Sequence, residues 1–300
     1  MRYVIGIDLG GTNIKAIAVK ESGELIREFS HPTRDGEFQG EIPQFAIEIR
    51  ELMGEIEAEL GEALSVGISA PGLATKDARA IYFIPGKMQG LPNFDWVDFL
   101  GRATPVVVWN DAHAALQGEA WVGAAAGKSD VLMFTIGTGI GGAIMCDGKL
   151  LKGHIGRAGH MGHVCIDSTR PGDDWNIPGS LEMSISEVFI KNLNHAKYQT
   201  TKALVDGYRT GAPEAVQLWT EAVRKFAVGV ASMINTLDPE LVIIGGGGAK
   251  AGDSLLQPFR QFMDEYEMRP DGHQVEIAVA QLDSNAGAFG VAKAALDALD

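Results

Sequence analysis

The chain has 300 residues, a length that suits two domains or one large domain. Hydrophobic residues make up 46% and charged residues 21%, an ordinary globular composition that excludes a disordered chain, a collagen-like fibre and a disulfide-stapled miniprotein. The net charge of −14 argues against sequence-independent nucleic-acid binding, which needs lysine and arginine against phosphate. A small anionic ligand in a local pocket is still compatible with this charge.

The cysteine content and the N-terminus indicate a cytoplasmic protein. Only two cysteines occur, Cys146 and Cys165, so no disulfide framework is implied and a reducing compartment fits best. The N-terminal segment becomes polar by Asp8 and has no signal-peptide core. The longest apolar runs have the length of strands, so we expect no membrane-spanning segment.

The first part of the chain predicts a β-meander followed by alternating helices and strands. Apolar runs separated by turn residues predict the strands, and helical spacing of apolar residues predicts the helices. The expected strands are residues 3–7, 14–19, 24–29, 64–69 and 106–109, and the expected helices are residues 42–60 and 112–120.

The second part repeats this pattern. Residues 130–136, 142–146 and 149–151 predict another strand–turn–strand–turn–strand unit, which indicates two similar halves facing a cleft. Two unrelated hairpins are the alternative. Strand and helix patterns then alternate, so the expected class is α/β, with the domain boundary just after Asp111. The remaining expected strands are residues 241–244 and 275–280, and the remaining helices are residues 214–237 and 286–299.

Glycine is unusually abundant, at 38 residues, and it clusters at the ends of three predicted strands. After the first strand, Asp8 precedes a Gly10-Gly11-Thr12 turn whose backbone N–H groups can face an anion. An acidic residue beside phosphate makes sense if Mg²⁺ lies between them. Lys15 could add positive charge or could be a solvated strand residue. Taken singly, each cluster could also be an ordinary hairpin turn.

The other two glycine clusters are similarly placed. Residues 137–142, which include Thr138 and Gly139, offer a second set of N–H donors. Residues 245–248, which include Gly246 and Gly247, follow a strand and precede an expected helix, where a nucleotide could rest its ribose or base. Three such turns together indicate phosphate binding better than any one of them.

The Asn110-Asp111 pair follows the strand at residues 106–109. A carboxylate at the mouth of a strand can accept a hydroxyl proton, and the neighbouring amide could orient that hydroxyl. The alternative is a helix N-cap, because Asn and Asp are common caps and a helix is expected from Ala112. Spacing alone favours the cap.

Two histidines and a cysteine lie close together at His160, His163 and Cys165. A metal site is one reading, but no second Cys/His pair follows at usable spacing. His163 could instead bind a polar substrate, or the histidines could be structural. We expect Cys165 to be a small buried hydrophobe.

Taken together, these residues resemble the ROK sugar kinases, a branch of the actin-like ATPase superfamily, from Ile5 to about Leu296. The resemblance implies a two-lobed actin-like ATPase (ribonuclease H-like) fold with a central cleft. It divides the chain into a smaller lobe, residues 1–111 completed by the helix at 286–300, and a larger lobe, residues 112–285. The motifs that carry it are Asp8-Leu9-Gly10-Gly11-Thr12, Ala70-Pro71-Gly72, Asn93 with Trp96, Asn110-Asp111-Ala112, the 137–142 glycine turn, Gly159-x-x-Gly162-His163, Leu181-Glu182 and Gly245-Gly246-Gly247.

The resemblance implies a kinase that uses ATP and Mg²⁺ to phosphorylate a sugar hydroxyl, and a homodimer. It makes Asp111 the catalytic base. The residues it places against the sugar are Gly72, Asn93, Asn110, His163 and Glu182, with His160 beside them. Those it places against phosphate are Asp8, Gly10, Gly11, Thr12, Thr138 and Gly139, and those on the adenosine side are Gly246 and Gly247.

Two departures from the family pattern matter. The family carries structural zinc on a histidine and three cysteines, whose cysteine positions are here Asp173, Trp175 and Ser180. Thiolates dominate zinc affinity at such sites, so we expect no zinc and suggest Trp175 packing as a replacement. His160 stands where the family has a sugar-contacting Glu, which puts glucose in doubt as the best substrate. His113 replaces a family Asn, with no consequence that the sequence indicates.

Three other functions compete with the kinase. A sugar-sensing repressor would need an N-terminal DNA-binding domain, for which the sequence before Asp8 leaves no room. A catalytically inactive sugar-binding or regulatory protein is conceivable, but both phosphate turns and Asp111 are intact. A hydrolase on the same fold is disfavoured by the sugar-side residues.

Overall fold

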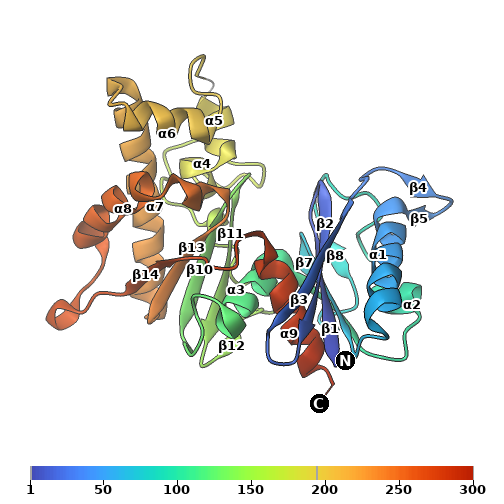
Figure 1. The fold of residues 1–300 in the computed structure, drawn as a ribbon. Coiled ribbons are helices and arrows are strands. Elements are labelled where there is room, and N and C mark those ends of the chain that lie inside the picture. The colour runs from blue at the N-terminus through green and yellow to red at the C-terminus, as the bar shows by residue number, and fades with distance from the viewer. Residues whose placement is uncertain (1, 194, 300) are drawn as a thin grey trace. The chain divides into compact units, whose positions relative to one another are not determined.

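The computed structural model of the protein describes residues 2–193 and 195–299. They form two compact units (Figure 1). Unit 1 comprises Met1–Gly127, Leu150–Ala158 and Gln281–Asp300, and unit 2 comprises Lys128–Lys149 and Gly159–Ala280. Among the described residues, no helix is both long enough and apolar enough to cross a membrane.

Unit 1 is built on a five-stranded sheet in the order β3-β2-β1-β6-β9. The first three strands form the predicted antiparallel meander, whereas β6 and β9 continue the sheet in parallel with β1. The strands of this sheet are β1 (Tyr3–Leu9), β2 (Asn13–Lys20), β3 (Leu25–Pro32), β6 (Val66–Ala70) and β9 (Val106–Asn110). Four short strands form two further ribbons: β4 (Phe38–Gln39) with β5 (Ile42–Pro43), and β7 (Leu73–Ala74) with β8 (Ile81–Phe83).

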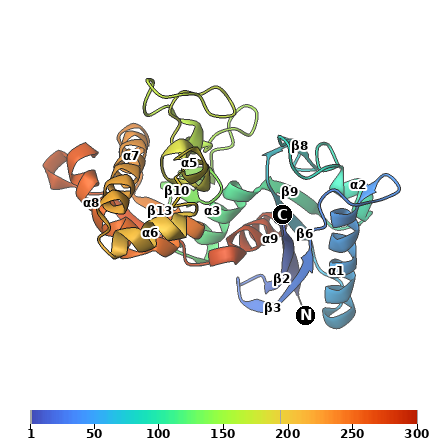
Figure 2. The same ribbon diagram turned by 90° about the horizontal axis from the view of Figure 1, so that it is seen from above.

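Helices cover both faces of this sheet, as Figure 2 shows from above. Apolar residues of α1 pack with one face of the sheet, and α9 packs on the other face beside α3. The helices of unit 1 are α1 (Gln44–Leu60), α2 (Trp96–Leu100), α3 (Asp111–Val122) and α9 (Ala286–Asp297), with a 3-10 turn at Asp283–Asn285. The expected helix at 42–60 begins at Gln44 because Ile42 precedes proline, which disfavours helical backbone there.

Glycines let α9 approach the sheet at backbone distance. A Cβ atom on Gly6 would lie 1.9 Å from the Ala288 carbonyl oxygen, and one on Gly67 would lie 2.0 Å from that of Val291. The C-terminal helix therefore packs directly on β1 and β6. It also packs along α3, so a boundary placed directly after Asp111 would separate two helices that are in contact within unit 1.

Unit 2 has a second five-stranded sheet, in the order β12-β11-β10-β13-β14. β10 pairs antiparallel with β11 and parallel with β13, and β13 pairs parallel with β14. The strands are β10 (Val131–Ile136), β11 (Ile140–Cys146), β12 (Lys149–Leu150), β13 (Leu241–Gly245) and β14 (Glu276–Val279). Its strand order matches that of unit 1, so the predicted structural repeat is confirmed.

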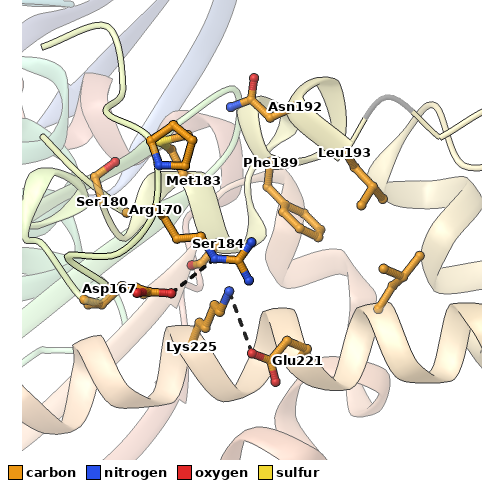
Figure 3. A pocket seen from close by; sticks show the side chains of 14 residues that line it. Asp167, Arg170, Ser180, Met183, Ser184, Phe189, Asn192, Leu193, Glu221 and Lys225 are labelled. Carbon is orange, nitrogen blue, oxygen red and sulfur yellow. Dashed lines mark hydrogen bonds and ion pairs between the residues drawn. The ribbon is translucent and has the colours of Figure 1, made fainter. Parts of the chain in front are cut away.

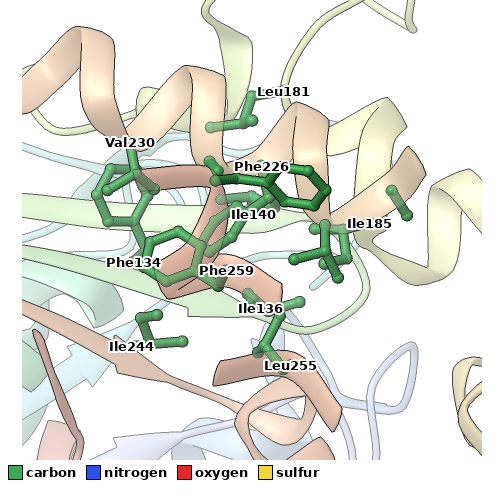
Figure 4. Packing of buried hydrophobic residues seen from close by; sticks show 14 of the residues in the cluster. Phe134, Ile136, Ile140, Leu181, Ile185, Phe226, Val230, Ile244, Leu255 and Phe259 are labelled. Atoms are coloured by element: carbon green, nitrogen blue, oxygen red, sulfur yellow. The ribbon is translucent and has the colours of Figure 1, made fainter. Parts of the chain in front are cut away.

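The core of unit 2 lies between its sheet and the long helix α7 (Figure 4). Phe226 of α7 meets Phe134 of β10 edge-on, with 5.8 Å between ring centroids, and its centroid lies 5.4 Å from that of Phe259. The helices are α4 (Glu182–Ile185), α5 (Glu187–Leu193), α6 (Thr201–Arg209), α7 (Pro213–Leu237) and α8 (Asp253–Tyr266), with 3-10 turns at Met161–His163, Gly247–Ala251 and Pro270–Gly272.

Candidate active site

In unit 1, Asp8 lies near the carboxyl end of β1, level with Ser69 of the parallel neighbour β6. The Ser69 hydroxyl donates a hydrogen bond of 2.7 Å to Asp8 Oδ1. Gly287 of α9 leaves room for this carboxylate, because a Cβ there would lie 2.8 Å from Oδ1. Burial raises the pKa of Asp8, and the Ser69 hydrogen bond and the charge of Lys15 oppose the rise. Sequence reasoning missed Ser69 and Gly287, although Ser69 ends a predicted strand.

The Gly10-Gly11-Thr12 turn joins β1 to β2. It is held from behind, because the Thr33 hydroxyl donates to the Gly10 carbonyl at 2.6 Å and the Thr33 N–H donates to the Thr12 carbonyl at 2.9 Å. Space around Gly11 is open, since no atom lies within 4 Å of where its Cβ would be. The Gly10 N–H donates to the Asn13 carbonyl at 3.2 Å, so the backbone that this fixed turn leaves open to a ligand is at Gly11. Lys15 stands opposite Asp8 in the β1–β2 register.

Asn110 is the N-cap of α3, so the capping alternative is confirmed for this residue. Its Oδ1 accepts the backbone N–H groups of Ala112 and His113 at 3.0 and 3.1 Å. Its amide nitrogen donates to the Gly72 carbonyl at 2.8 Å and to Asp111 Oδ1 at 2.9 Å. Asn110 is 3% exposed, so these four bonds fix both the helix start and the carboxylate of Asp111.

Asp111 is the first residue of α3 and is accessible to solvent. Desolvation by the surrounding protein, reinforced by the negative charge of Asp8, raises the pKa of Asp111 to about 6. Hydrogen bonds from the Ala112 N–H and from Asn110 oppose this rise. The result is a carboxylate that is ionised at neutral pH and is a stronger proton acceptor than an ordinary aspartate.

The other sugar-side candidates of unit 1 are less tightly connected. Gly72 has φ 106°, which favours glycine, and it joins the site through the bond from Asn110. Asn93 also has a left-handed backbone, φ 61°, and its N–H donates to the Ile81 carbonyl at 2.7 Å. Asn93 is exposed, and no hydrogen bond within the described part of unit 1 joins its side chain to Asn110 or Asp111.

In unit 2, the Thr138-Gly139 turn joins β10 to β11 and is braced by α5. The N–H of Val188 donates to the Thr138 carbonyl at 3.0 Å, and that of Glu187 donates to the Gly137 carbonyl at 3.1 Å. Glu182 lies against Gly139, because a Cβ on this glycine would be 2.4 Å from Glu182 Oε2. The structure thus brings a predicted phosphate residue and a predicted sugar residue together.

His163 lies between two carboxylates. Its Nδ1 is 3.4 Å from Asp173 Oδ2 and 3.7 Å from Glu182 Oε1. Burial raises the pKa of Glu182, the charge of His163 opposes this rise, and Asp173 adds to it. His160 is partly buried and precedes the 3-10 turn that carries His163, whose N–H donates to the His160 carbonyl at 3.2 Å. The two histidines are therefore positioned by one short turn.

Asp173 anchors the loop that leads to α4. Its Oδ1 accepts the N–H groups of Trp175 and Ile177 at 2.9 and 3.0 Å. Burial would raise the pKa of Asp173, but these backbone hydrogen bonds and the contact with His163 outweigh it and lower the pKa below its usual range. This carboxylate adds to the backbone hydrogen bonds of the loop, such as that from the Asp173 N–H to the Ile177 carbonyl at 3.0 Å. Trp175 is 46% exposed and meets the His163 ring edge-on, with 6.1 Å between centroids.

The zinc-ligand positions of the family do not fit zinc in this chain. Of the three residues at cysteine positions, Trp175 offers no ligand atom, Ser180 offers only a hydroxyl, and Asp173 uses Oδ1 for the loop N–H groups and has only Oδ2 near His163. His163, Asp173 and Glu182 do bring ligand atoms within 4.8 Å of one another, which is a different, thiolate-free donor set.

Cys165 corrects one sequence expectation, because it is exposed rather than buried. It lies after the 3-10 turn of His163 and forms an isolated bridge with Ser180 in the loop region before α4. Apolar character alone could not place it, since the loop is held by backbone bonds and not by a core.

Gly246 and Gly247 lie directly after β13. Gly246 has φ 76°, and its Cβ would lie 2.5 Å from the Ile136 carbonyl oxygen, so only glycine fits there. No atom lies within 4 Å of a Cβ on Gly247, so its backbone is open to a ligand. The helix expected after this cluster begins as a 3-10 turn and continues as α8.

A pocket of about 420 Å³ lies elsewhere in unit 2, between the 166–184 segment, α5 and α7 (Figure 3). Its two cations are paired with carboxylates: Arg170 Nε lies 3.2 Å from Asp167 Oδ2, and Lys225 Nζ lies 3.7 Å from Glu221 Oε1. Since none of the candidate site residues lines it, this pocket adds nothing to the active site.

Comparisons with known proteins agree along almost the whole chain. The sequence profile of the ROK family matches residues 4–298. A glucokinase of Thermotoga maritima is 31% identical over 308 residues, which cover 96% of this chain and 96% of that protein. A ROK hexokinase from Thermus thermophilus has a TM-score of 0.83 at 28% identity, covering 99% of both chains. A ROK family glucokinase from Streptomyces griseus, in complex with glucose and AMPPNP, has a TM-score of 0.79 at 27% identity, covering 98% of this chain and 99% of that one.

Proposed function

This chain belongs to the ROK family and is an ATP-dependent carbohydrate kinase, and on that premise we propose that Asp111 is the general base of its reaction. Its fold is the expected α/β, two-lobed actin-like ATPase fold. The observation that carries the proposal is the Asn110–Asp111 pair, in which a buried, four-bonded amide holds a carboxylate whose pKa is raised to about 6.

The reaction transfers the γ-phosphoryl of ATP to a hydroxyl of a hexose or hexose derivative. The hydroxyl oxygen attacks the γ-phosphorus, the bond to the β–γ bridging oxygen breaks, and ADP leaves. Asp111 accepts the hydroxyl proton, and Asn110 keeps the carboxylate oriented toward it. Because phosphoryl transfer needs little covalent help, positioning and charge stabilisation supply most of the rate.

The binding roles that we propose rest on which backbone N–H groups and side chains are free to contact ATP or the sugar. The Gly10 to Thr12 turn, through the N–H groups of Gly11 and Thr12, and the Thr138-Gly139 turn would donate to phosphate, with Lys15 adding positive charge. The open backbone of Gly247, beside Gly246, would accommodate the adenosine. Gly72, Asn93, Asn110, His160, His163 and Glu182 would bind the sugar hydroxyls.

Mg²⁺ would be held with ATP near Asp8. The fit rests on the chemistry of this carboxylate, which is partly buried, bonded to Ser69 and close enough to Asp111 to raise the pKa of Asp111. A hard cation prefers such oxygen ligands, and it would supply charge neutralisation for the phosphates. Asp8 would bind the Mg²⁺ ion, and Ser69 would position the Asp8 carboxylate.

The proposal also covers the localisation and the oligomeric state of the enzyme. The cysteine usage fits a cytoplasmic enzyme, and we propose a homodimer. The rival function is a sugar-binding or regulatory protein without catalysis, and it predicts sugar binding with no ADP formation.

The test is ADP formation with ATP and Mg²⁺ across a sugar panel, using wild type, Asp111→Asn and the control Asp271→Asn. We expect sugar-dependent turnover that falls by at least about 100-fold in Asp111→Asn, while sugar binding by calorimetry persists. Asp271 is exposed with φ 53°, a conformation that Asn also tolerates, so its variant should match wild type. Near wild-type turnover in a folded, sugar-binding Asp111→Asn would refute the base assignment.

A further inference from the structure

Unit 1 contains a cavity of about 300 Å³, and of its lining residues only Asn110 has a role in the function proposed above. It lies beside β9 and is closed by the segment after β7 and by the 150–158 segment. Its polar and aromatic lining comes from Thr75, Lys76, Trp109, Asn110, His113 and Lys152. The volume is at the lower end of the range for small-molecule sites.

The side chains that line this cavity carry positive charge, whereas the whole protein is negatively charged. Its lining contains two lysines and no carboxylate, although the chain has a net charge of −14. Most lysines with a described contact are paired with an acid, as Lys20 is with Glu24. Lys152, in contrast, forms no ion pair with any residue the structure describes. A local concentration of unpaired positive charge selects an anion.

Trp109 fixes the position of this charge. The Lys152 ammonium lies 3.8 Å from the centroid of the Trp109 ring, a cation–π contact that holds it on the cavity wall. Desolvation lowers the pKa of Lys152, with no acidic neighbour to counter it. An anion in the cavity would supply the missing counter-charge and would form a charge-assisted hydrogen bond.

His113 positions the 150–158 segment and does not add a second positive charge to the cavity. Its Nε2 donates to the Ala158 carbonyl at 2.8 Å, and so ties the 150–158 segment to α3. Burial lowers the pKa of His113, the hydrogen bond to Ala158 opposes this fall, and the positive charge of Lys152 adds to it, so that the pKa lies below its usual value. The anchored segment then presents Lys152 to the cavity.

The cavity adjoins the proposed base, because Asn110 lines it and also bonds Asp111. We propose that it is an anion subsite for the acceptor, in which Lys152 binds a carboxylate or phosphate carried by a hexose derivative. This inference rests on the proposed kinase function, and it makes Lys152 a specificity residue of that reaction.

The kinetic test compares neutral hexoses with hexuronates and with hexose phosphates as acceptors. A hydrogen bond to a charged group corresponds to about a tenfold or larger preference, so kcat/KM should favour one anionic class over its neutral parent by that factor. Comparing hexuronates with hexose phosphates shows whether the subsite binds a carboxylate or a phosphate. Lys152→Gln should bring the ratio of anionic to neutral kcat/KM close to one, and Lys152→Arg should restore most of it.

Lys149→Gln is the matched control, because Lys149 is an exposed lysine nearby in the sequence that does not line the cavity. It should keep the wild-type ratio. A wild-type enzyme that prefers neutral hexoses, with the same ratio in Lys152→Gln, would overturn the subsite and leave the kinase intact.

A binding measurement separates failure of the subsite from failure of the kinase. Titration of the ATP-free protein with glucuronate and with glucose 6-phosphate should show saturable binding that weakens at least about tenfold in Lys152→Gln. Such binding without turnover of any acceptor would support the subsite and count against the proposed kinase function. Binding of both anions that is unchanged in Lys152→Gln, or no binding at all, would overturn the inference.

Discussion

The side chain of Asn110 links the start of a helix to the proposed base. Its oxygen satisfies the free N–H groups of Ala112 and His113, and its nitrogen bonds Gly72 and Asp111. The capping geometry therefore sets the orientation of the carboxylate that we propose as the base. At such a position, the stability of α3 and the chemistry of Asp111 depend on one amide.

The raised pKa of Asp111 predicts the acid limb of the pH–rate profile. Asp111 must be ionised to accept a proton, and its pKa is about 6 in the free protein. We expect kcat/KM for the sugar to be constant from pH 7 to 8 and to fall about tenfold per unit below pH 6. This is measured with a coupled assay at fixed Mg²⁺ and ATP.

Ser69→Ala gives a second profile for comparison. Removing the hydroxyl that stabilises the Asp8 carboxylate should raise the pKa of Asp8 further without removing Asp111. Because a protonated Asp8 no longer raises the pKa of Asp111, the acid limb set by Asp111 should move downward. If kcat/KM of the wild-type enzyme fell only below pH 4, the reaction would depend on a carboxylate with an ordinary pKa or on no carboxylate.

At the scale of elements, the repeated β-meander could be predicted because its strands are continuous apolar runs separated by glycine turns. Asp8 and Asp111 could be predicted as site residues because both follow such strands. The pairing of Asp8 with Ser69 could not, since it depends on the parallel register of β1 and β6. The short helices α4 and α5 were also missed, because helices of 4 and 7 residues form only through tertiary contacts such as the bond from Glu187 to Gly137.

The Asp173 loop yields a prediction about what replaces the family's zinc site. Asp173→Ala removes a nearly fully buried carboxylate and leaves the N–H groups of Trp175 and Ile177 without their acceptor. We expect a loss of about 1–3 kcal/mol in the free energy of unfolding. Because the pKa of Asp173 is lowered, the stabilisation is present at neutral pH and is lost as the pH falls below the usual carboxylate range.

Chemical denaturation checks the Asp173 effect, with Asp174→Ala as the control, since Asp174 is the exposed neighbour. The control should unfold like wild type. Elemental analysis of the purified protein should find less than one tightly held zinc per chain, and chelator should not change its stability. One tightly held zinc, lost together with stability in chelator, would contradict a metal-free loop.

For the whole molecule, the two units share one sheet order but carry different insertions, and the chain as a whole is strongly acidic. The proposed phosphate turns and Lys15 would attract ATP only locally, through short contacts that salt screens weakly. The net charge of −14 repels ATP over longer distances. The Debye length is about 30 Å at 0.01 M ionic strength and about 8 Å at 0.15 M, so salt removes the repulsion first.

We therefore predict that KM for ATP falls as ionic strength rises from about 0.01 M to about 0.15 M, the range over which the Debye length shortens most. The expected change is about twofold to threefold, which corresponds to about 1 kT of repulsion removed over this range. Initial rates at fixed free Mg²⁺, with potassium chloride varied, measure it. KM for an uncharged hexose is the internal control and should stay constant, because a neutral acceptor feels no long-range field. If KM for ATP rose with salt instead, attraction at the phosphate turns would outweigh the net charge, and the field at the nucleotide site would be positive despite the acidic chain.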